Sequence, residues 1–397
     1  MTLTAAGSSA WADTSTRVEE PETFSPYVRG QYGYDSNLFR INSEQQALAV
    51  LGRTRRAESF YTLAAGMDAN LTFSRQTVSA HAELSRTQFN TYSALDYDGR
   101  DLLLKWNWLA GSRLTGNVGV AERLTEASYA NVRQPVSNLV RTRRGFFQGA
   151  LQVGSPWQVL FGMDRIQTNN DAIEQRTQNA TTDSASTGVQ YETAKGSTLA
   201  LMSRYTNGSY PNRQLIGAAQ VNNDYRQWDN GIVLGWAPSG KTKVAGTLNY
   251  TRRSYSDVPQ RDFSGLTGLL SMDWTVTGKT TLKAEVHRDI GAIDNTTASY
   301  TVNDGIAVGA DWKPTAKLTL NTRLRYDSID FSGDPAFALA GRSAREDRLT
   351  TLQAGMQYAV LRNTQLGLLL QRGDRRSSEA LSGYDYNSAY ITVRSQF

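Results

Sequence analysis

The sequence lacks cysteine, and this absence excludes disulfide bonds and thiol-ligated metal sites. Only 2 of the 397 residues are histidines. No stretch approaches the roughly 18 to 20 consecutive apolar residues of a membrane-spanning helix, and the mean hydropathy is -0.47. Prolines are scarce at 9, against 33 glycines and 19 tyrosines, a mixture that favours strands and glycine-containing turns over helices.

The overall composition is that of a folded chain. Apolar residues make up 39% and charged residues 20%, which is typical neither of a disordered chain nor of a membrane-helical one. The length of 397 residues allows two ordinary domains or one large barrel.

The amino-terminal residues indicate an exported protein. Ala10-Trp11-Ala12 before Asp13 fits a signal-peptidase site, although a basic segment and a full apolar segment are missing in front of it. We expect residues 1–12 to be the remnant of a secretory signal and residues 13–23 to be a short periplasmic segment before a barrel at 24–397. An irregular leader of small residues is the alternative.

Alternation with a period of two residues dominates the rest of the chain. In "YTLAAGMDANLTF", Tyr61, Leu63 and Met67 share one face with other apolar residues, while Asp68 and Asn70 share the polar one. About 18 such segments follow one another, each near the roughly 10 residues that cross an outer membrane when tilted. Tight connections such as "GSP" and "PSGK" alternate with longer polar ones. The pattern predicts an all-β transmembrane antiparallel barrel of about 18 strands, with short periplasmic turns and longer extracellular loops.

Aromatic residues are placed as two lipid interfaces would select them. One set lies at strand ends beside the short turns: Trp108, Trp157, Trp236, Trp274, Trp312 and Tyr358. The other lies near the longer loops: Tyr34, Tyr92, Tyr205, Tyr255 and Phe331. Together with the barrel pattern, these two girdles predict the outer membrane of a Gram-negative bacterium, with its lipid as a partner.

The chain ends on an alternating strand, "AYITVRSQF", closed by Phe397. A last strand must pair with the first to remove the edges of a barrel. The ending resembles the terminal aromatic strand of bacterial outer-membrane barrels, which the barrel-insertion machinery reads. The resemblance implies that Phe397 is an assembly signal.

Both ends of the barrel segment resemble one narrower group. "SPYVRGQYGYDSNLFRI" is similar to the opening of the outer-membrane porins encoded in exopolysaccharide gene clusters, the EpsL-like proteins, with Asp35, Asn37, Leu38, Phe39 and Arg40 on the shared pattern. The closing "LGLLLQRGDRRSSEALSGYDYNSAYITVRSQF" is similar too. The resemblance implies a channel that helps a polysaccharide substrate cross the outer membrane, in contact with periplasmic polysaccharide-export proteins.

Alternate residues of the predicted strands define an inner wall. Its charged members are the candidate lumen and substrate-path residues Arg29, Asp68, Glu83, Lys105, Arg123, Arg144, Arg204, Arg253, Glu285, Arg323, Arg325 and Arg394. Such a wall can exchange hydrogen bonds with sugar hydroxyls, and arginine can pair with carboxylates. An ordinary solvated porin interior explains the same residues equally well.

One long connection predicts a helix. Ser43 followed by Gln46, an apolar run and Gly52 is typical of a capped short helix within residues 41–57. Its apolar residues need cover, either inside the barrel mouth or in an extracellular lid.

Enzymatic and other binding functions find little support. His81 and His287 are the two possible imidazole bases, each with a glutamate two residues away on the same face, and no serine elbow accompanies either. We find no phosphate-binding glycine loop, no clustered metal ligands and no single basic stripe for nucleic acid, and we predict no cofactor. Three functions remain: a polysaccharide-export channel first, a general or sugar-uptake diffusion porin second, and a barrel enzyme or structural adhesin third.

Overall fold

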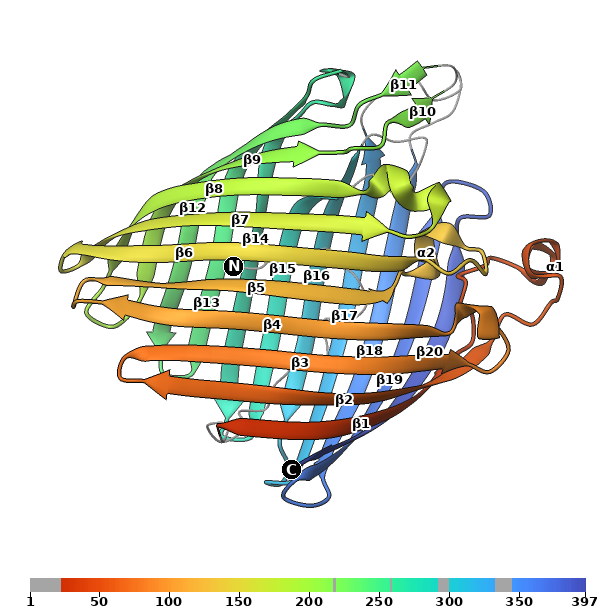
Figure 1. The fold of residues 1–397 in the computed structure, drawn as a ribbon, viewed down its shortest axis with the longest axis horizontal. Helices are drawn as coiled ribbons and strands as arrows, with labels where there is room; N and C mark the ends of the chain where they lie inside the picture. The colour runs from red at the N-terminus through yellow and green to blue at the C-terminus, as the bar shows by residue number, and fades with distance from the viewer. Residues whose placement is uncertain (1–22, 217–218, 258, 292–299, 333–344) are drawn as a thin grey trace.

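The computed structural model is a closed β-barrel, and it describes residues 23–216, 219–257, 259–291, 300–332 and 345–397. Its main sheet has 18 strands, each antiparallel to both neighbours (Figure 1). The predicted fold class is therefore confirmed. The expected signal remnant at 1–12 and nearly all of the segment at 13–23 lie outside the described residues.

The strands follow the chain around the barrel. The first half consists of β1 (Phe24–Asp35), β2 (Glu58–Phe73), β3 (Gln76–Phe89), β4 (Tyr97–Ala110), β5 (Leu114–Glu126), β6 (Leu139–Gly154), β7 (Trp157–Asn170), β8 (Ala180–Glu192) and β9 (Thr198–Ser209). The second half consists of β12 (Tyr225–Ser239), β13 (Thr242–Tyr255), β14 (Phe263–Thr277), β15 (Thr280–Gly291), β16 (Tyr300–Trp312), β17 (Leu318–Ser332), β18 (Glu346–Ala359), β19 (Thr364–Ser377) and β20 (Tyr384–Gln396). Two short strands, β10 (Gln214–Ile216) and β11 (Ala219–Val221), pair with each other between β9 and β12.

Closure occurs between the first and last strands. β1 pairs with β20 from Tyr27 opposite Gln396 to Asp35 opposite Ser388. Beyond the last strand, the amide of Phe397 donates to the carbonyl of Pro26 at 2.8 Å. The pairing satisfies the backbone groups that an open edge would expose to lipid.

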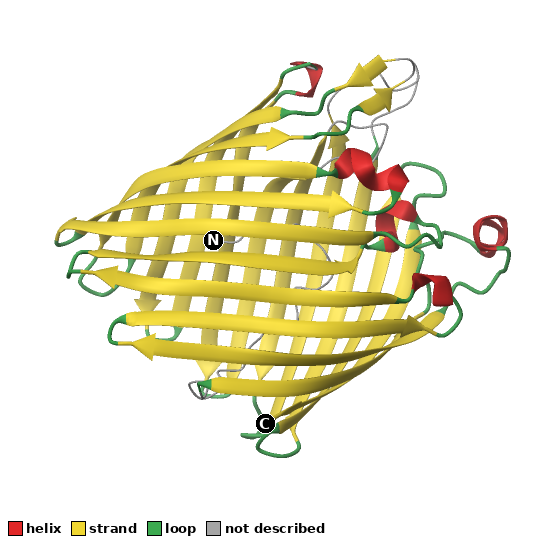
Figure 2. Ribbon diagram, in the orientation of Figure 1, coloured by secondary structure: helices red, strands yellow, loops and turns green. Residues whose placement is uncertain are grey.

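The two ends of the barrel differ as the sequence predicts. Connections such as 74–75, 155–156 and 240–241 lie at one end, whereas longer ones such as 36–57 and 127–138 lie at the other. The helices gather at the long-loop end (Figure 2). Phe24 and Gln396 are both at the short-turn end, because β1 leads into a long loop and β20 begins after one.

The outer face of the barrel is formed by the alternate residues of each strand that are mostly apolar. Leu63, Met163 and Leu201 are 63%, 67% and 66% exposed, and the residues on either side of each face inward. Exposure of this kind all around a barrel is the lipid-facing band of an outer-membrane protein. Among the described residues, no helix is both long and apolar enough to cross a membrane.

The predicted aromatic girdles hold at one end and fail in part at the other. Trp236 and Trp312 are about half exposed on the outer face beside the short turns, as expected. At the loop end, Tyr255 and Phe331 are buried on the inner face, and Tyr92 packs among the loops, so these three do not belong to a girdle. Nearness to a loop in the sequence does not fix which face of the strand a residue occupies.

The predicted short helix is α1 (Glu44–Leu51). The Ser43 hydroxyl accepts from the amide of Gln46 at 3.2 Å, and Gly52 ends the helix at φ 68°, a left-handed conformation that glycine adopts without strain. Figure 1 shows α1 beyond the long-loop end of the barrel, so it does not plug the lumen.

Side chains from several loops form a loop cluster that packs against one side of α1 and leaves Leu48 55% exposed. Its buried members are Phe39, Ile41, Ala47, Phe89, Leu95 and Tyr129. Leu95 belongs to the turn η1 (Ser93–Leu95), and Tyr129 begins α2 (Tyr129–Val132). The remaining helical turns are η2 (Ile173–Gln178) and η3 (Pro259–Arg261). Of the two positions expected for the apolar side of α1, the extracellular one is observed.

Candidate functional site

The inner wall of the barrel is the candidate site. Every one of the predicted lumen residues lies on the parity opposite the exposed apolar face of its strand. Arg29, for example, follows the exposed Val28, and Lys105 stands between the exposed Leu104 and Trp106. These side chains therefore share the interior, and their neighbours around the wall decide what they can do.

One group of inward charges lies beside the closure of the barrel. Arg29 on β1 reaches over β2 to Glu83 on β3, with its Nη2 at 2.5 Å from Oε1 and its Nε at 3.2 Å from Oε2. The Tyr27 hydroxyl donates to the same carboxylate at 2.8 Å. Gly66 on β2 lies between these two strands, and because it has no side chain it leaves room for the Tyr27 ring. A Cβ added at Gly66 would clash with that ring.

Asp68 ties the last strand into this group. Its carboxylate lies 2.6 Å from His81 Nδ1 and 2.8 Å from Arg394 Nη2, so it joins β20 to β2 and β3. The Arg394 guanidinium also stacks 3.7 Å from the ring centre of Tyr27. We call Tyr27, Arg29, Asp68, His81, Glu83 and Arg394 the closure group. Its cations and carboxylates are matched, which favours a structural role.

A second group, the β17 group, lies on β15 and β17. Arg323 donates to Glu285 at 3.1 Å, and Arg325 donates to Asp327 at 2.8 Å. His287 lies beside Arg325 and Asp327. Its Nε2 is 3.2 Å from an Asp327 oxygen and 3.1 Å from an Arg325 nitrogen. The two arginines are about a quarter to a third exposed toward the lumen, so their charge is accessible to a passing solute.

The remaining inward cations fall into two kinds. Arg144 is paired with Asp164 at 2.6 Å, and Arg123 approaches Asp101 at 3.8 Å. Lys105, Arg204 and Arg253, by contrast, have no carboxylate oxygen within 4.0 Å among the described residues. Arg253 instead donates to Gln227 at 2.7 Å and stacks 4.4 Å from the ring of Tyr225.

Only His287 lies within ion-pair distance of the glutamate that its spacing suggests, and its nearer partner is a different carboxylate. His81 contacts Asp68 on the neighbouring strand, while Glu83 is held by Arg29. His287 lies 3.9 Å from Glu285 but closer to Asp327. Within the described ranges, no group of three or more potential ligands could hold a metal ion. In the part of the chain that the structure describes, the hydrogen bonds of the two imidazoles are to Asp68 and Arg325 and not to a serine or threonine hydroxyl.

The extracellular mouth is bridged by one arginine that the sequence did not single out. Arg133, in the loop between β5 and β6, donates to the carbonyls of Leu381 at 2.9 Å and Ser382 at 2.7 Å. That loop thus reaches past the ends of β1 to β4 to the loop between β19 and β20. Burial, and next the positive charge of Arg375, lower the pKa of Arg133. We call this contact the Arg133 bridge.

A buried carboxylate anchors the same side of the mouth. Asp347 is 0% exposed and accepts from Arg345 at 2.6 Å and from Arg375 at 2.5 Å. Arg345 also pairs with Glu379 at 2.9 Å. Parity places Asp347 and Arg375 on the inner face, but only the pairing of β18 with β19 brings them together, so sequence reasoning missed this network.

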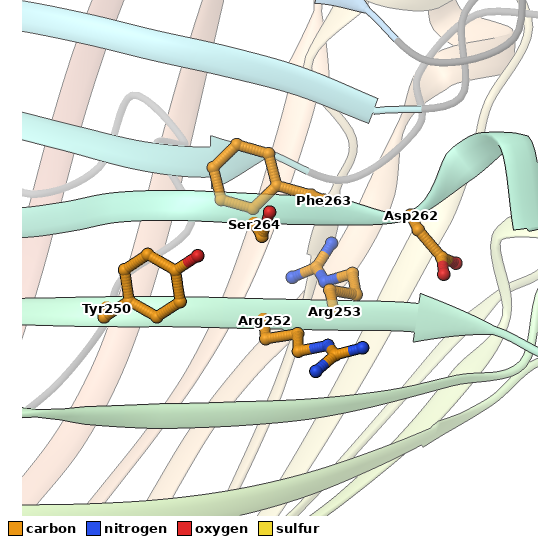
Figure 3. Close-up of a pocket in the computed structure, with 6 residues that line it drawn as sticks. All are labelled: Tyr250, Arg252, Arg253, Asp262, Phe263 and Ser264. Carbon is orange, nitrogen blue, oxygen red and sulfur yellow. The ribbon is translucent and has the colours of Figure 1, made fainter.

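A shallow pocket opens at the rim, where β13 ends and β14 begins (Figure 3). It is lined by Tyr250, Arg252, Arg253, Asp262, Phe263 and Ser264. Figure 3 shows the side chains of Arg252 and Arg253 leaving β13 in different directions, as consecutive strand residues do. The pocket therefore straddles the wall and is not itself the channel.

Comparisons with known proteins agree with this architecture. Residues 239–397 match the family model described as "Putative beta-barrel porin 2". The fold is similar to Pseudomonas aeruginosa OpdK, solved with vanillate, at 11% identity and TM-score 0.52, covering 94% of this chain and 99% of that one. It is also similar to Pseudomonas aeruginosa OccK2 in complex with glucuronate, at 12% identity and TM-score 0.52, covering 94% and 98%. Acinetobacter baumannii OccAB3 gives 10% identity and TM-score 0.51 over the same shares. No curated protein matches the chain significantly.

The protein is an outer-membrane β-barrel with a fold similar to that of the solved porin structures. The closed sheet, the lipid-facing apolar band and the similar solved barrels agree on this, and they locate it in the outer membrane of a Gram-negative bacterium. These comparisons give no support to the narrower resemblance to exopolysaccharide-cluster porins.

Proposed function

We propose that the protein is a passive diffusion channel that admits small polar solutes across the outer membrane. The observation that carries the proposal is an inner wall lined with charged and polar side chains inside a closed barrel of 18 strands. Barrels of 16 to 18 strands leave an aqueous channel. Solutes would exchange hydration for hydrogen bonds to this wall without a catalytic step.

The pairing of charges supports weak selectivity. Arg29 with Glu83, Arg144 with Asp164 and Arg323 with Glu285 cancel much of one another's field within the wall. Lys105 and Arg204 remain without a carboxylate within ion-pair distance among the described residues. Isolated charges in a wet channel act over about one Debye length, roughly 8 to 10 Å at physiological salt, so they bias transport modestly.

Uptake of small solutes is better supported than polysaccharide export. The sequence favoured export on its resemblance to exopolysaccharide-cluster porins, with uptake as the alternative. The similar barrels OpdK and OccK2 were solved with vanillate and with glucuronate, which are both small organic acids. At 12% identity or less they support only the size class of the solute for this chain.

Liposome swelling tests the proposal. Purified protein, folded in detergent and reconstituted into liposomes, should admit glucose and glucuronate at similar rates, and entry should slow steeply as oligosaccharide length increases. Heat-modifiable gel migration would verify that the barrel is folded. Equal exclusion of every sugar by folded protein would contradict the proposal.

Deletion of the gene separates the two directions of transport. We expect slower growth on a limiting small solute with unchanged surface polysaccharide. Loss of surface polysaccharide with normal small-solute uptake would favour export instead.

A further inference from the structure

The outer face of the barrel changes character along its length. In the half of each described strand nearer the short turns, the outward face carries no charged side chain. Charges begin above the apolar band, in the part of the strands nearer the long loops, where the headgroups of the outer leaflet lie. The outward arginines at this level are Arg86, Arg100, Arg141, Arg143, Arg165, Arg226, Arg252, Arg288, Arg348, Arg372 and Arg376.

Four of these arginines gather on adjacent strands. The patch spans β3 to β6, and we call it the outer-wall patch: Arg86, Asp98, Arg100, Glu122, Arg141 and Arg143. With four arginines and two carboxylates, it carries a surplus of positive charge. It lies directly above Leu84, Leu102 and Val120, which are exposed members of the lipid-facing band.

The contacts inside the patch leave donors unused. Glu122 is held between Arg100 and Arg143, each with a nitrogen at 2.5 Å from one carboxylate oxygen. Arg86 pairs with Asp98 at 3.1 Å. Arg141 has no carboxylate oxygen within 4.0 Å among the described residues, and its Nε and that of Arg100 are buried without a hydrogen-bond partner.

Some of the other outward arginines are each paired with one carboxylate. Arg288 pairs with Asp304 at 3.0 Å, and Arg348 pairs with Glu346 at 2.9 Å. Both pairs lie at the same level as the outer-wall patch but have one carboxylate for each arginine. They provide matched controls for the role of surplus charge.

We propose that the outer-wall patch binds the phosphate groups of a phosphorylated glycolipid of the outer leaflet, the lipopolysaccharide class. Guanidinium groups bind phosphate oxygens through paired, charge-assisted hydrogen bonds, and several neighbouring arginines suit a ligand with more than one negative charge. The apolar band just below would receive the acyl chains of the same molecule. This continuity of an apolar and a cationic surface selects a lipid rather than a soluble anion.

Binding would place a phosphate beside the arginines that contact Glu122. A phosphate approaching from the headgroup layer can bind the guanidinium groups of Arg143, whose side chain is 52% exposed, and of Arg141, while Glu122 keeps its two contacts. Glu122 nevertheless competes for the same cations. Its replacement by glutamine should therefore tighten lipid binding, whereas loss of the arginines should weaken it.

The test measures binding of purified lipopolysaccharide to protein refolded without it. Native mass spectrometry or thermophoresis would compare wild type, Arg100→Gln/Arg141→Gln/Arg143→Gln, Glu122→Gln and the control Arg288→Gln/Arg348→Gln. Each protein is also tested with chemically dephosphorylated lipopolysaccharide, which keeps the acyl chains and sugars. Heat-modifiable migration verifies folding before binding is measured.

We expect the triple variant to bind phosphorylated lipopolysaccharide about tenfold more weakly or worse, since several charge-assisted bonds are lost. The control variant should bind like wild type, Glu122→Gln should bind more tightly, and dephosphorylation should remove the difference between wild type and triple variant. Wild-type affinity in the triple variant, or equal binding of the dephosphorylated lipid by wild type, would overturn the proposal. If the triple variant does not fold, Glu122→Gln decides alone: unchanged or weaker binding would overturn it.

Discussion

Neutralising the two lumen arginines of the β17 group should make the channel cation-selective. In Arg323→Gln/Arg325→Gln, Glu285 loses its contact at 3.1 Å, and Asp327 keeps only His287 at 3.2 Å. The carboxylates then remain on the wall without the arginines that balance them. The permeability of the channel to cations should rise, and its permeability to anions should fall.

The size of the effect follows from distance and screening. A unit charge about 7 Å from an ion in water contributes roughly 0.6 kcal/mol, and a Debye length of about 10 Å at 0.1 M salt halves this. The loss of two charges favours cations and disfavours anions by about 0.6 kcal/mol each. The ratio of cation to anion permeability should therefore rise by about sevenfold at 0.1 M salt. At 1 M, where the Debye length is about 3 Å, the change should fall below about twofold.

Reversal potentials in a salt gradient across planar bilayers measure this ratio. Glu285→Gln should shift selectivity in the opposite direction, and the outward-facing Arg348→Gln should leave it unchanged. An unchanged ratio in the double variant at low salt would refute the reasoning, and so would a shift that persists at 1 M.

Three further predictions concern the mouth and the assembly of the barrel. Arg133→Ala removes the two hydrogen bonds that its charged side chain donates to Leu381 and Ser382, each worth roughly 1.5 to 3 kcal/mol, so an external protease should cut loop 127–138 at least about tenfold faster while the heat-modifiable band persists. Asp347→Asn leaves two buried arginines without their shared carboxylate, at a cost of about 3 to 5 kcal/mol, and should lower the temperature at which the folded band disappears on a gel. Deletion of Phe397, whose side chain is 68% exposed on the lipid-facing parity, should reduce inserted protein without changing synthesis, measured by membrane fractionation and immunoblotting; normal insertion would contradict its role as an assembly signal.

The strands and their faces could be predicted because the relevant signal is local. A residue's parity within its own strand decides whether it faces lipid or lumen, so Arg29, Lys105 and Arg204 could be placed on the inner wall without knowledge of any partner. The capped helix α1 was equally accessible, because Ser43, Gln46 and Gly52 act within one short segment.

The partners of the site residues could not be predicted, because they depend on register and closure. Asp68 contacts Arg394, which lies 326 residues away in sequence, only because β20 closes onto β1. The register of β1, β2 and β3 likewise pairs Glu83 with Arg29 and not with His81. The Arg133 bridge depends on how far one loop reaches across the mouth, and the alternation of apolar and polar residues does not predict the conformation of a loop.

Single-channel recording tests most directly the claim that this barrel is an open, polar diffusion channel. Folded wild-type protein added to a planar bilayer should give stepwise, ohmic increases in conductance that a small sugar does not abolish. Insertion of folded protein without conductance steps would contradict the claim.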